Sequence, residues 1–187
     1  MLHVDLLTNL SVYLSNPRTS LNDKLLKICK AVKLAVPTCD RVSIWLFFNN
    51  NTELVALKCL DERSVQTQGE VLSAQDHPAY FAHILANEFL IAADARTHAN
   101  TESFTSAYFT NYDIYSLLDV TFKKDYLPLG VICCERTKII THWQTADAEI
   151  LKKISLKASL FISDNIADTF ASKSKADIIA QLNNHNT

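Results

Sequence analysis

Cysteine and histidine are the residues of this chain best able to bind a metal or act in catalysis, and their spacing favours neither role. The cysteines are odd in number and include no CxxC pair, which argues against a disulfide framework and against a zinc site. The histidines from His77 to His142 show no ligand spacing such as HxxxH. No Gly-x-Ser-x-Gly elbow or recognisable Ser/His/Asp grouping is present. We therefore predict no catalytic residue and no metal site.

The cysteines are better explained as small buried hydrophobes. They are Cys29, Cys39, Cys59, Cys133 and Cys134. Because Cys133 and Cys134 are neighbours in a strand pattern, they should point to opposite faces of a sheet, where they are poorly placed to act as a redox pair.

Two aspartates stand in contexts that call for polar contacts. Asp94 ends a predicted strand and precedes a polar loop that contains Thr97, so it either lines a pocket or closes an Asx-type turn of its own loop, which we favour. Asp119 lies between apolar residues of another strand, and a carboxylate that faces inward needs a partner. It could bind a polar ligand atom, but we favour pairing with Arg41 or Arg136 across the sheet.

Aromatic residues give a further candidate pocket wall. Phe104 and Tyr108 stand four residues apart on a predicted helix and therefore share a face. Such a pair is more often core than ligand contact, although a pocket wall can serve both roles. Glu135, near the end of the last predicted strand, is expected to be exposed to solvent or paired.

The composition excludes several functional classes. Gly69 and Gly130 are the only glycines, whereas phosphate-cradling loops need several to let the backbone approach the anion. The 18 basic and 20 acidic residues are spread without long runs, so we expect no nucleic-acid partner and no membrane partner. No apolar run approaches the roughly 20 residues that span a bilayer, and a signal peptide is not evident. We expect a cytoplasmic protein.

Hydrophobic periodicity predicts an α+β fold around an antiparallel sheet. Predicted helices cover residues 2–14, 21–35, a stretch from 77, 103–111 and about twenty-five residues from 145. Predicted strands cover 41–48, 53–60, 91–95, 115–122 and 127–136, with a weaker pattern at 71–72. Both alternating faces of residues 41–48 are apolar, so we expect this strand to be covered on both sides.

Six blocks of the sequence resemble, in order, those of GAF domains, the sensory modules of bacterial signalling proteins. The blocks are RVSIWLF, LSAQDHPAYF, IAADARTH, SLLDV, LGVICCE and HWQTADAEIL. They are similar to a bacterial subgroup in which a histidine kinase, diguanylate cyclase or phosphatase unit follows the domain. The resemblance spans roughly residues 21–167. It divides the chain into an N-terminal helix (1–18), a GAF domain (19–171) and a C-terminal helical extension or tail (172–187).

The resemblance implies a GAF-like (profilin-like) fold with a central antiparallel sheet of five or six strands. Terminal helices would cover one face and commonly form a dimer bundle, while shorter helices and loops would enclose a small-molecule pocket on the other. The residues expected to contact a ligand there are Trp45, Asp94, Thr97, Phe104, Tyr108, Ser116 and Asp119.

Departures from better-known GAF domains leave the ligand and any cofactor unidentified. No cysteine lies between Cys59 and Cys133, so the resemblance implies neither covalent bilin attachment nor the chemistry of GAF-type free methionine sulfoxide reductases. The Asn-Lys-Phe-Asp-Glu signature of cyclic-nucleotide-binding GAF domains is absent.

Three functional hypotheses follow. The first is a non-enzymatic sensor that binds a small molecule, forms a homodimer and regulates a downstream kinase or cyclase output domain. The second is a structural dimerisation module with an empty or vestigial pocket, and the third is a free methionine sulfoxide reductase. For the dimer, we expect one helical stripe to cover the sheet and leave apolar surface for a partner: Leu151, Ile154, Ala158, Phe161, Ile162 and Ile166.

Overall fold

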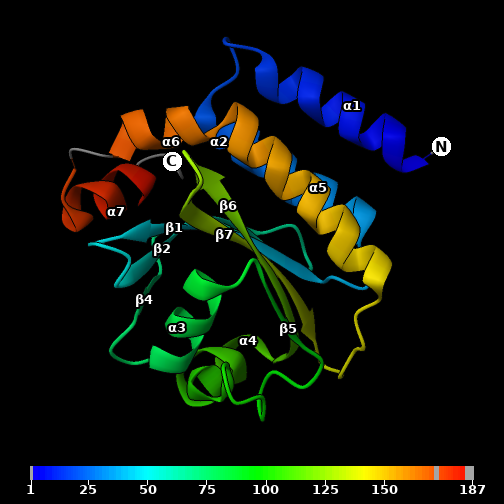
Figure 1. The fold of residues 1–187 in the computed structure, drawn as a ribbon, viewed down its shortest axis with the longest axis vertical. Coiled ribbons are helices and arrows are strands. Elements are labelled where there is room, and N and C mark those ends of the chain that lie inside the picture. Colours follow the sequence, from blue (N-terminus) through cyan, green and yellow to red (C-terminus); the bar gives the residue numbers. More distant parts are fainter. Residues whose placement is uncertain (1, 171–172, 184–187) are drawn as a thin grey trace.

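An antiparallel sheet with helices on both faces organises the described part of the chain, residues 2–170 and 173–183, in the computed structural model (Figure 1). The strands are β1 (Arg41–Phe48), β2 (Glu53–Leu60), β3 (Gln66–Thr67), β4 (Val71–Ser73), β5 (Phe89–Ala92), β6 (Ile114–Lys124) and β7 (Leu127–Thr137). The helices are α1 (Leu2–Ser15), α2 (Leu21–Ala35), α3 (Pro78–Ala86), α4 (Thr110–Tyr112), α5 (Thr145–Phe161), α6 (Ser163–Phe170) and α7 (Lys175–Asn183). A 3₁₀-helix, η1 (Glu102–Phe104), and a π-helix, η2 (Thr105–Phe109), precede α4.

The sheet runs in the order β3-β2-β1-β7-β6-β5, and β4 also pairs with β2. Every pairing in it is antiparallel. The described sheet has seven strands rather than five or six, because the two-residue strand β3 leaves no pattern in the sequence. Strand β1 lies in the middle, and its residues are buried on both faces up to Phe47. The predicted antiparallel α+β fold is confirmed.

Each face of the sheet carries its own hydrophobic core. On one face, α1, α2, α5 and α6 form a coat over the sheet, and on the other α3, η1, η2 and α4 form a cap (Figure 1). Strand β6 shows the division, since Leu118 and Val120 face the coat whereas Leu117 faces the cap. Cys134 belongs to the coat-side core and Cys133 to the cap-side core. The predicted opposite orientation of these cysteines is therefore correct.

Local sequence signals explain where the coat helices begin and end. Ser20 caps α2 by accepting a hydrogen bond from the backbone N–H of Asp23 at 3.1 Å. Helix α5 begins with a capping box formed by Gln144 and Asp147. The helical pattern from residue 145 does not form one long helix, because α5 ends at Phe161 and α6 resumes at Ser163.

The predicted helix over 103–111 is replaced by three short helical turns, η1, η2 and α4. The last of them ends at Asp113, whose left-handed backbone (φ 54°) stops the helix. The strand expected at 91–95 is β5, which begins earlier and ends at Ala92.

The ends of the described chain both pack on the coat-side core. Helix α1 buries Leu10 and Leu14 against the coat, and α7 buries Ile178 and Leu182. The domain limits at 18/19 and 171/172 stay predictions, and residues 171, 172 and 184–187 lie outside the described part. Within the described residues, no helix is both long and apolar enough to cross a bilayer.

Candidate functional site

A small cavity lies between the sheet and the cap. Its free volume is about 20 Å³, which is room for about one water molecule. Its walls are largely aromatic, with two carboxylates among them: Trp45, Tyr80, Phe104, Tyr108, Asp119 and Glu135. Four of the seven predicted ligand-contact residues, Trp45, Phe104, Tyr108 and Asp119, therefore meet at one cavity.

Strand register explains why the polar residues meet there. Directly opposite residues of antiparallel strands share a face, and Asp119 on β6 lies opposite Cys133 on β7. Two residues further along β7, Glu135 lies opposite Arg41 on β1. Because side chains alternate along a strand, Asp119, Cys133, Glu135 and Arg41 all face the cap.

Asp119 is buried, with 1% of its surface exposed, and only one of its oxygens has a hydrogen-bond partner. Oδ2 accepts a bond of 2.6 Å from the hydroxyl of Tyr80 on α3, whereas Oδ1 has no partner among the described residues. Burial raises the pKa of Asp119 to about 7, although the neighbouring Cys133 thiol and the bond from the Tyr80 hydroxyl act to lower it. The inward orientation of Asp119 is confirmed, but pairing with Arg41 or Arg136 is wrong.

Arg41 instead forms a buried network with Glu135 and Tyr108. The guanidinium donates to Glu135 Oε2 and to the Tyr108 hydroxyl, and that hydroxyl donates to Glu135 Oε1 at 2.9 Å. Burial by itself would lower the pKa of Arg41, but Glu135, Tyr108 and Cys59 together outweigh it and keep the arginine protonated. Tyr112 covers the guanidinium with its ring at 4.2 Å. The network joins the cap to the sheet.

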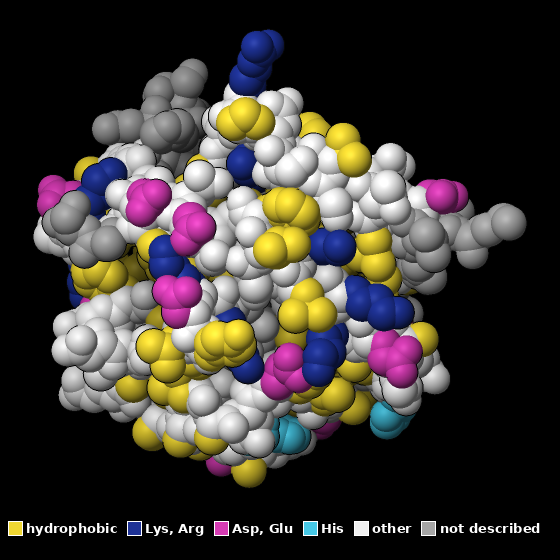
Figure 2. All heavy atoms as spheres, turned by 45° about the horizontal axis from the view of Figure 1, so that its top comes forward, with side chains coloured by type: hydrophobic (Ala, Val, Ile, Leu, Met, Phe, Trp, Pro, Cys, Tyr) yellow, Lys and Arg dark blue, Asp and Glu magenta, His cyan; other side chains and the backbone are white. Residues whose placement is uncertain are grey.

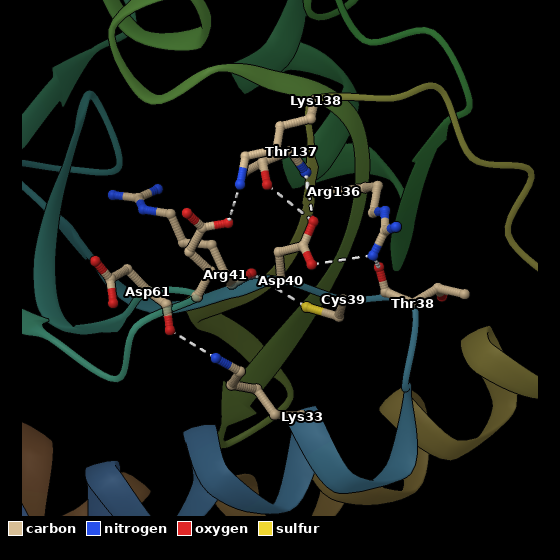
Figure 3. Close-up of polar contacts among 10 residues, drawn as sticks. Lys33, Thr38, Cys39, Asp40, Arg41, Asp61, Arg136, Thr137 and Lys138 are labelled. Atoms are coloured by element: carbon tan, nitrogen blue, oxygen red, sulfur yellow. Dashed lines mark hydrogen bonds and ion pairs between the residues drawn. The ribbon is translucent and has the colours of Figure 1, made fainter.

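Arg136 makes its contacts at the end of the β1–β7 pair, away from Asp119. Its Nη1 donates to Asp40 Oδ1 at 3.0 Å, and Asp40 Oδ2 accepts from the backbone N–H and the hydroxyl of Thr137, each at 2.9 Å (Figure 3). Alongside, Lys138 forms an ion pair of 2.8 Å with Glu62. These contacts fix the start of β1 and so hold Arg41 in place.

Asp94 and Thr97 organise the cap and do not line the cavity. Asp94 accepts hydrogen bonds from the Arg96 backbone at 3.2 Å and from the Thr97 hydroxyl at 2.8 Å, so the favoured Asx-type turn is confirmed. The turn directs Arg96, whose Nε donates to the Ile114 carbonyl at 2.7 Å and whose guanidinium lies over the Tyr115 ring at 3.7 Å. This loop therefore supports the segment that carries Tyr108.

Ser116 lies on the coat side of β6, in phase with Leu118 rather than with Asp119. Its hydroxyl donates to the Ala93 carbonyl at 2.5 Å and accepts from the Thr141 backbone at 2.7 Å. Both hydrogen bonds are structural, and the sheet separates Ser116 from the cavity.

Two groups at the cavity were missed by sequence reasoning: the Tyr80 hydroxyl, and Glu135 as the partner of Arg41. Tyr80 was not singled out as a site residue, since nothing in a helical pattern identifies a hydroxyl's distant acceptor. Glu135 left a usable signal, because it follows Cys133 by two residues and so shares its face. The register of β1 against β7 places Glu135 opposite Arg41. The hydrophobic pattern of the sequence does not reveal this register.

The cysteine thiols are poorly suited to reaction. All five are buried and unpaired. Burial raises the pKa of Cys59 to about 12 and raises the pKa values of Cys29, Cys133 and Cys134 well above the ordinary range of a thiol. Across the described residues, no group of three or more His, Cys, Asp or Glu side chains is arranged to hold a metal ion.

The sequence model of the GAF domain family matches residues 21–162 of this chain. The matched stretch contains the sheet, the cap and the coat helices α2 and α5. The chain belongs to the GAF family. Members of this family are sensory and regulatory domains of signalling proteins. No curated protein sequence matches the chain significantly.

Solved GAF domains share this fold at low sequence identity. The GAF domain of an Acinetobacter phosphoenolpyruvate-protein phosphotransferase has a TM-score of 0.68 at 19% identity, covering 90% of this chain and 98% of that one. The corresponding domain from Coxiella burnetii gives 0.67 at 14% identity, with 89% and 96% covered. The chromophore-binding domain of Stigmatella aurantiaca phytochrome P1 gives 0.64 at 14% identity, covering 87% of this chain and 60% of that chain. At these identities, the likeness establishes the fold and not the ligand.

Proposed function

We propose that this GAF domain is a non-enzymatic sensor of bacterial signal transduction that binds a small molecule between the sheet and the cap. The observation that carries the proposal is the unpartnered Oδ1 of Asp119, buried at an aromatic cavity. A buried acceptor without a partner costs roughly 1–3 kcal/mol. A ligand that donates a hydrogen bond there would recover this energy, so the free energy of binding has an identifiable source. Trp45, Phe104, Tyr108 and Asp119 are the proposed contacts.

The size of the cavity favours a second candidate, a structural module whose pocket is filled by its own side chains. Ligand pockets usually offer about 300–1,000 Å³, far more than the 20 Å³ found here. Under the sensor hypothesis, aromatic side chains such as Phe104 and Tyr108 must therefore move aside when the ligand enters. Under the structural hypothesis, they stay in place and a single water satisfies Asp119.

A thermal-shift screen against a metabolite library separates the two candidates. Leu72 lines the cavity and is only partly buried, so Leu72→Trp should fill the cavity without unfolding the protein. The matched control is Leu127→Trp, because Leu127 is exposed at the β6–β7 turn. A sensor would show a ligand that raises the melting temperature of the wild type and of Leu127→Trp but not of Leu72→Trp. A library without any such compound would support the structural module.

The buried thiols support a non-enzymatic role. A free methionine sulfoxide reductase needs a cysteine that reacts as the thiolate, and burial disfavours the thiolate of Cys59 and Cys133. We expect no turnover of free methionine sulfoxide with a thiol reductant. Measurable turnover that is lost on substitution of a cysteine would contradict the proposal.

We further propose that the domain works as a cytoplasmic homodimer coupled to a kinase or cyclase output domain. A ligand can drive an output only if it binds one arrangement of the helices better than the other. Helix α1 lies on the outer side of α2 and α5, which themselves pack on the sheet (Figure 1). On this side of the molecule, apolar side chains lie among charged side chains of both signs (Figure 2), and a non-obligate interface is on the whole no more apolar than other protein surface.

A further inference from the structure

We propose that the cavity at Asp119 receives the ammonium group of a small organic amine. This inference rests on the proposed sensory function and names the class of its ligand. Oδ1 of Asp119 has no hydrogen-bond partner among the described residues, and in the ionised carboxylate it is free to accept one. An occupant that donates a hydrogen bond there stabilises the ionised form of a carboxyl group that is 1% exposed.

The charges around the cavity disfavour an anionic ligand. The lining contains two carboxyl groups, Asp119 and Glu135, and no lysine, arginine or histidine. Arg41 lies behind the wall, where Glu135 and the Tyr108 hydroxyl engage its Nη1. A ligand carboxylate or phosphate would thus meet one unpaired carboxyl group and no cation free to bind it. A cation meets a complementary charge.

The aromatic walls favour a cation over a neutral donor. Trp45, Tyr80, Phe104 and Tyr108 all line the cavity, and aromatic faces attract cations, most strongly where water is excluded. The free volume of about 20 Å³ matches one water molecule, and an ammonium group is of similar size. The head group therefore fits the space that exists, and only the remainder of the ligand requires the rings to move.

Binding of a cation should be linked to release of a proton. Tyr80 from α3, Tyr108 from η2, and Cys133 and Glu135 from β7 are the titratable groups around Asp119, and β5 contributes the apolar Leu90 opposite it. Burial raises the pKa of Asp119 to about 7, so below neutral pH the carboxyl group is protonated. When the ammonium group binds, the carboxyl O–H bond breaks, the proton passes to the buffer, and the carboxylate accepts N–H bonds.

Methylammonium chloride is the probe, with sodium chloride at equal ionic strength as the reference. Methanol and sodium acetate are the neutral and anionic probes of similar size. A ligand this small should bind with a Kd on the order of millimolar. We expect methylammonium alone to raise the melting temperature saturably, with affinity about tenfold higher at pH 8 than at pH 6. Calorimetry in two buffers of different ionisation enthalpy should detect close to one proton released per ligand at pH 6 and little at pH 8.

Asp119→Asn should abolish the methylammonium response, and Asp168→Asn, which changes an exposed carboxylate, should leave it intact. Proton release is measured on the wild type, so that test stands even if Asp119→Asn does not fold. An equal response to methanol or acetate, a response that survives in Asp119→Asn, or no proton release at pH 6 would overturn the inference. If a neutral or anionic metabolite binds and Leu72→Trp blocks it, the sensor function stands and only the amine assignment fails.

Discussion

At the scale of single residues, Asp119 should make the stability of the protein depend on pH. Its pKa is about 7 in the folded protein and 3.8 in an ordinary solvated aspartate. Between these values the folded state holds a proton that the unfolded chain has released. The free energy of unfolding therefore falls as pH rises through this window and levels off above pH 7.

Asp119→Asn removes this titration. We expect the stability of the variant, relative to the wild type, to improve by roughly 2–3 kcal/mol between pH 5 and pH 7.5, because a shift of one pKa unit corresponds to 1.36 kcal/mol. Urea unfolding at several pH values measures the difference. Asp168→Asn is the control and should run parallel to the wild type. A parallel curve for Asp119→Asn as well would show that Asp119 is ionised in the folded state.

Glu135→Ala should be the most damaging single change to a charged residue. It leaves the guanidinium of Arg41 buried without its carboxylate, which typically costs 3–5 kcal/mol. Glu88→Ala is the comparison, since Glu88 pairs with Lys152 at the surface and exposed pairs contribute about 0–1 kcal/mol. Chemical denaturation measures both.

The double variant Arg41→Met/Glu135→Leu shows why Glu135→Ala loses stability. The loss can come from the unpaired charge left on Arg41 or from a net stabilisation that the ion pair provides. Replacing both charges with apolar side chains removes the uncompensated charge, so it should recover much of the stability that Glu135→Ala loses. A double variant as unstable as Glu135→Ala would instead show that the pair stabilises the fold beyond satisfying its own charges.

At the scale of elements, the centre of the sheet depends on the absence of a side chain at Gly130. A Cβ built there would lie 2.1 Å from the Trp45 carbonyl oxygen and 2.5 Å from the ring of Phe122. Strand β7 can pack between β1 and β6 at this point only because glycine has no Cβ. The other glycine, Gly69, has a different role, since its backbone adopts a φ of 85°.

Gly130→Ala should therefore destabilise the protein by about 3 kcal/mol, the upper end of the usual cost of overpacking, because a backbone oxygen cannot move aside as a flexible side chain can. Gly69→Ala tests conformational strain alone and should cost about 1–2 kcal/mol. Urea unfolding of the two variants gives the comparison. Equal losses would mean that β7 shifts to accommodate the methyl group.

At the scale of the whole molecule, most residues of the predicted dimer stripe are buried inside the protein, in the coat-side core. Leu151, Ile154 and Ala158 are fully buried on the inner face of α5, and Phe161 is partly buried against the same core. The prediction that this stripe leaves apolar surface for a partner is therefore wrong. The apolar side chains that α5 does expose are Leu156 and Leu160, at 54% and 70%.

Leu160→Glu is accordingly the sharper test of the proposed dimer. We expect light scattering after size exclusion to give a dimer mass for the wild type at micromolar concentration and a monomer mass for the variant, because a charge in an interface is costly to bury. Val65→Glu, at an exposed site between β2 and β3, should remain dimeric. A wild type that is monomeric throughout would remove the dimer from the proposed function.

The amino-acid sequence by itself determined the secondary structure and the fold family of this protein. Strands β1 and β2 and helix α2 occupy the predicted residues, because hydrophobic alternation, helical spacing and the Ser20 cap are local signals. The sequence also identified Asp119 as an inward-facing carboxylate. Its errors in secondary structure include the segment over residues 103–111, where local patterns do not distinguish a π-helix from an α-helix, and the helix from residue 145, which is divided between α5 and α6.

Only the tertiary structure decided which residues of the site contact one another and how large the cavity is. That Asp119 meets Tyr80, and that Arg41 meets Glu135, follows from strand offsets and from how the cap sits on the sheet. These contacts join residues 39 and 94 positions apart in the chain, so no local pattern encodes them. The free volume of about 20 Å³ is what remains after aromatic rings from three separate segments have packed together. Such a remainder is a property of the whole packing and of no single stretch of sequence.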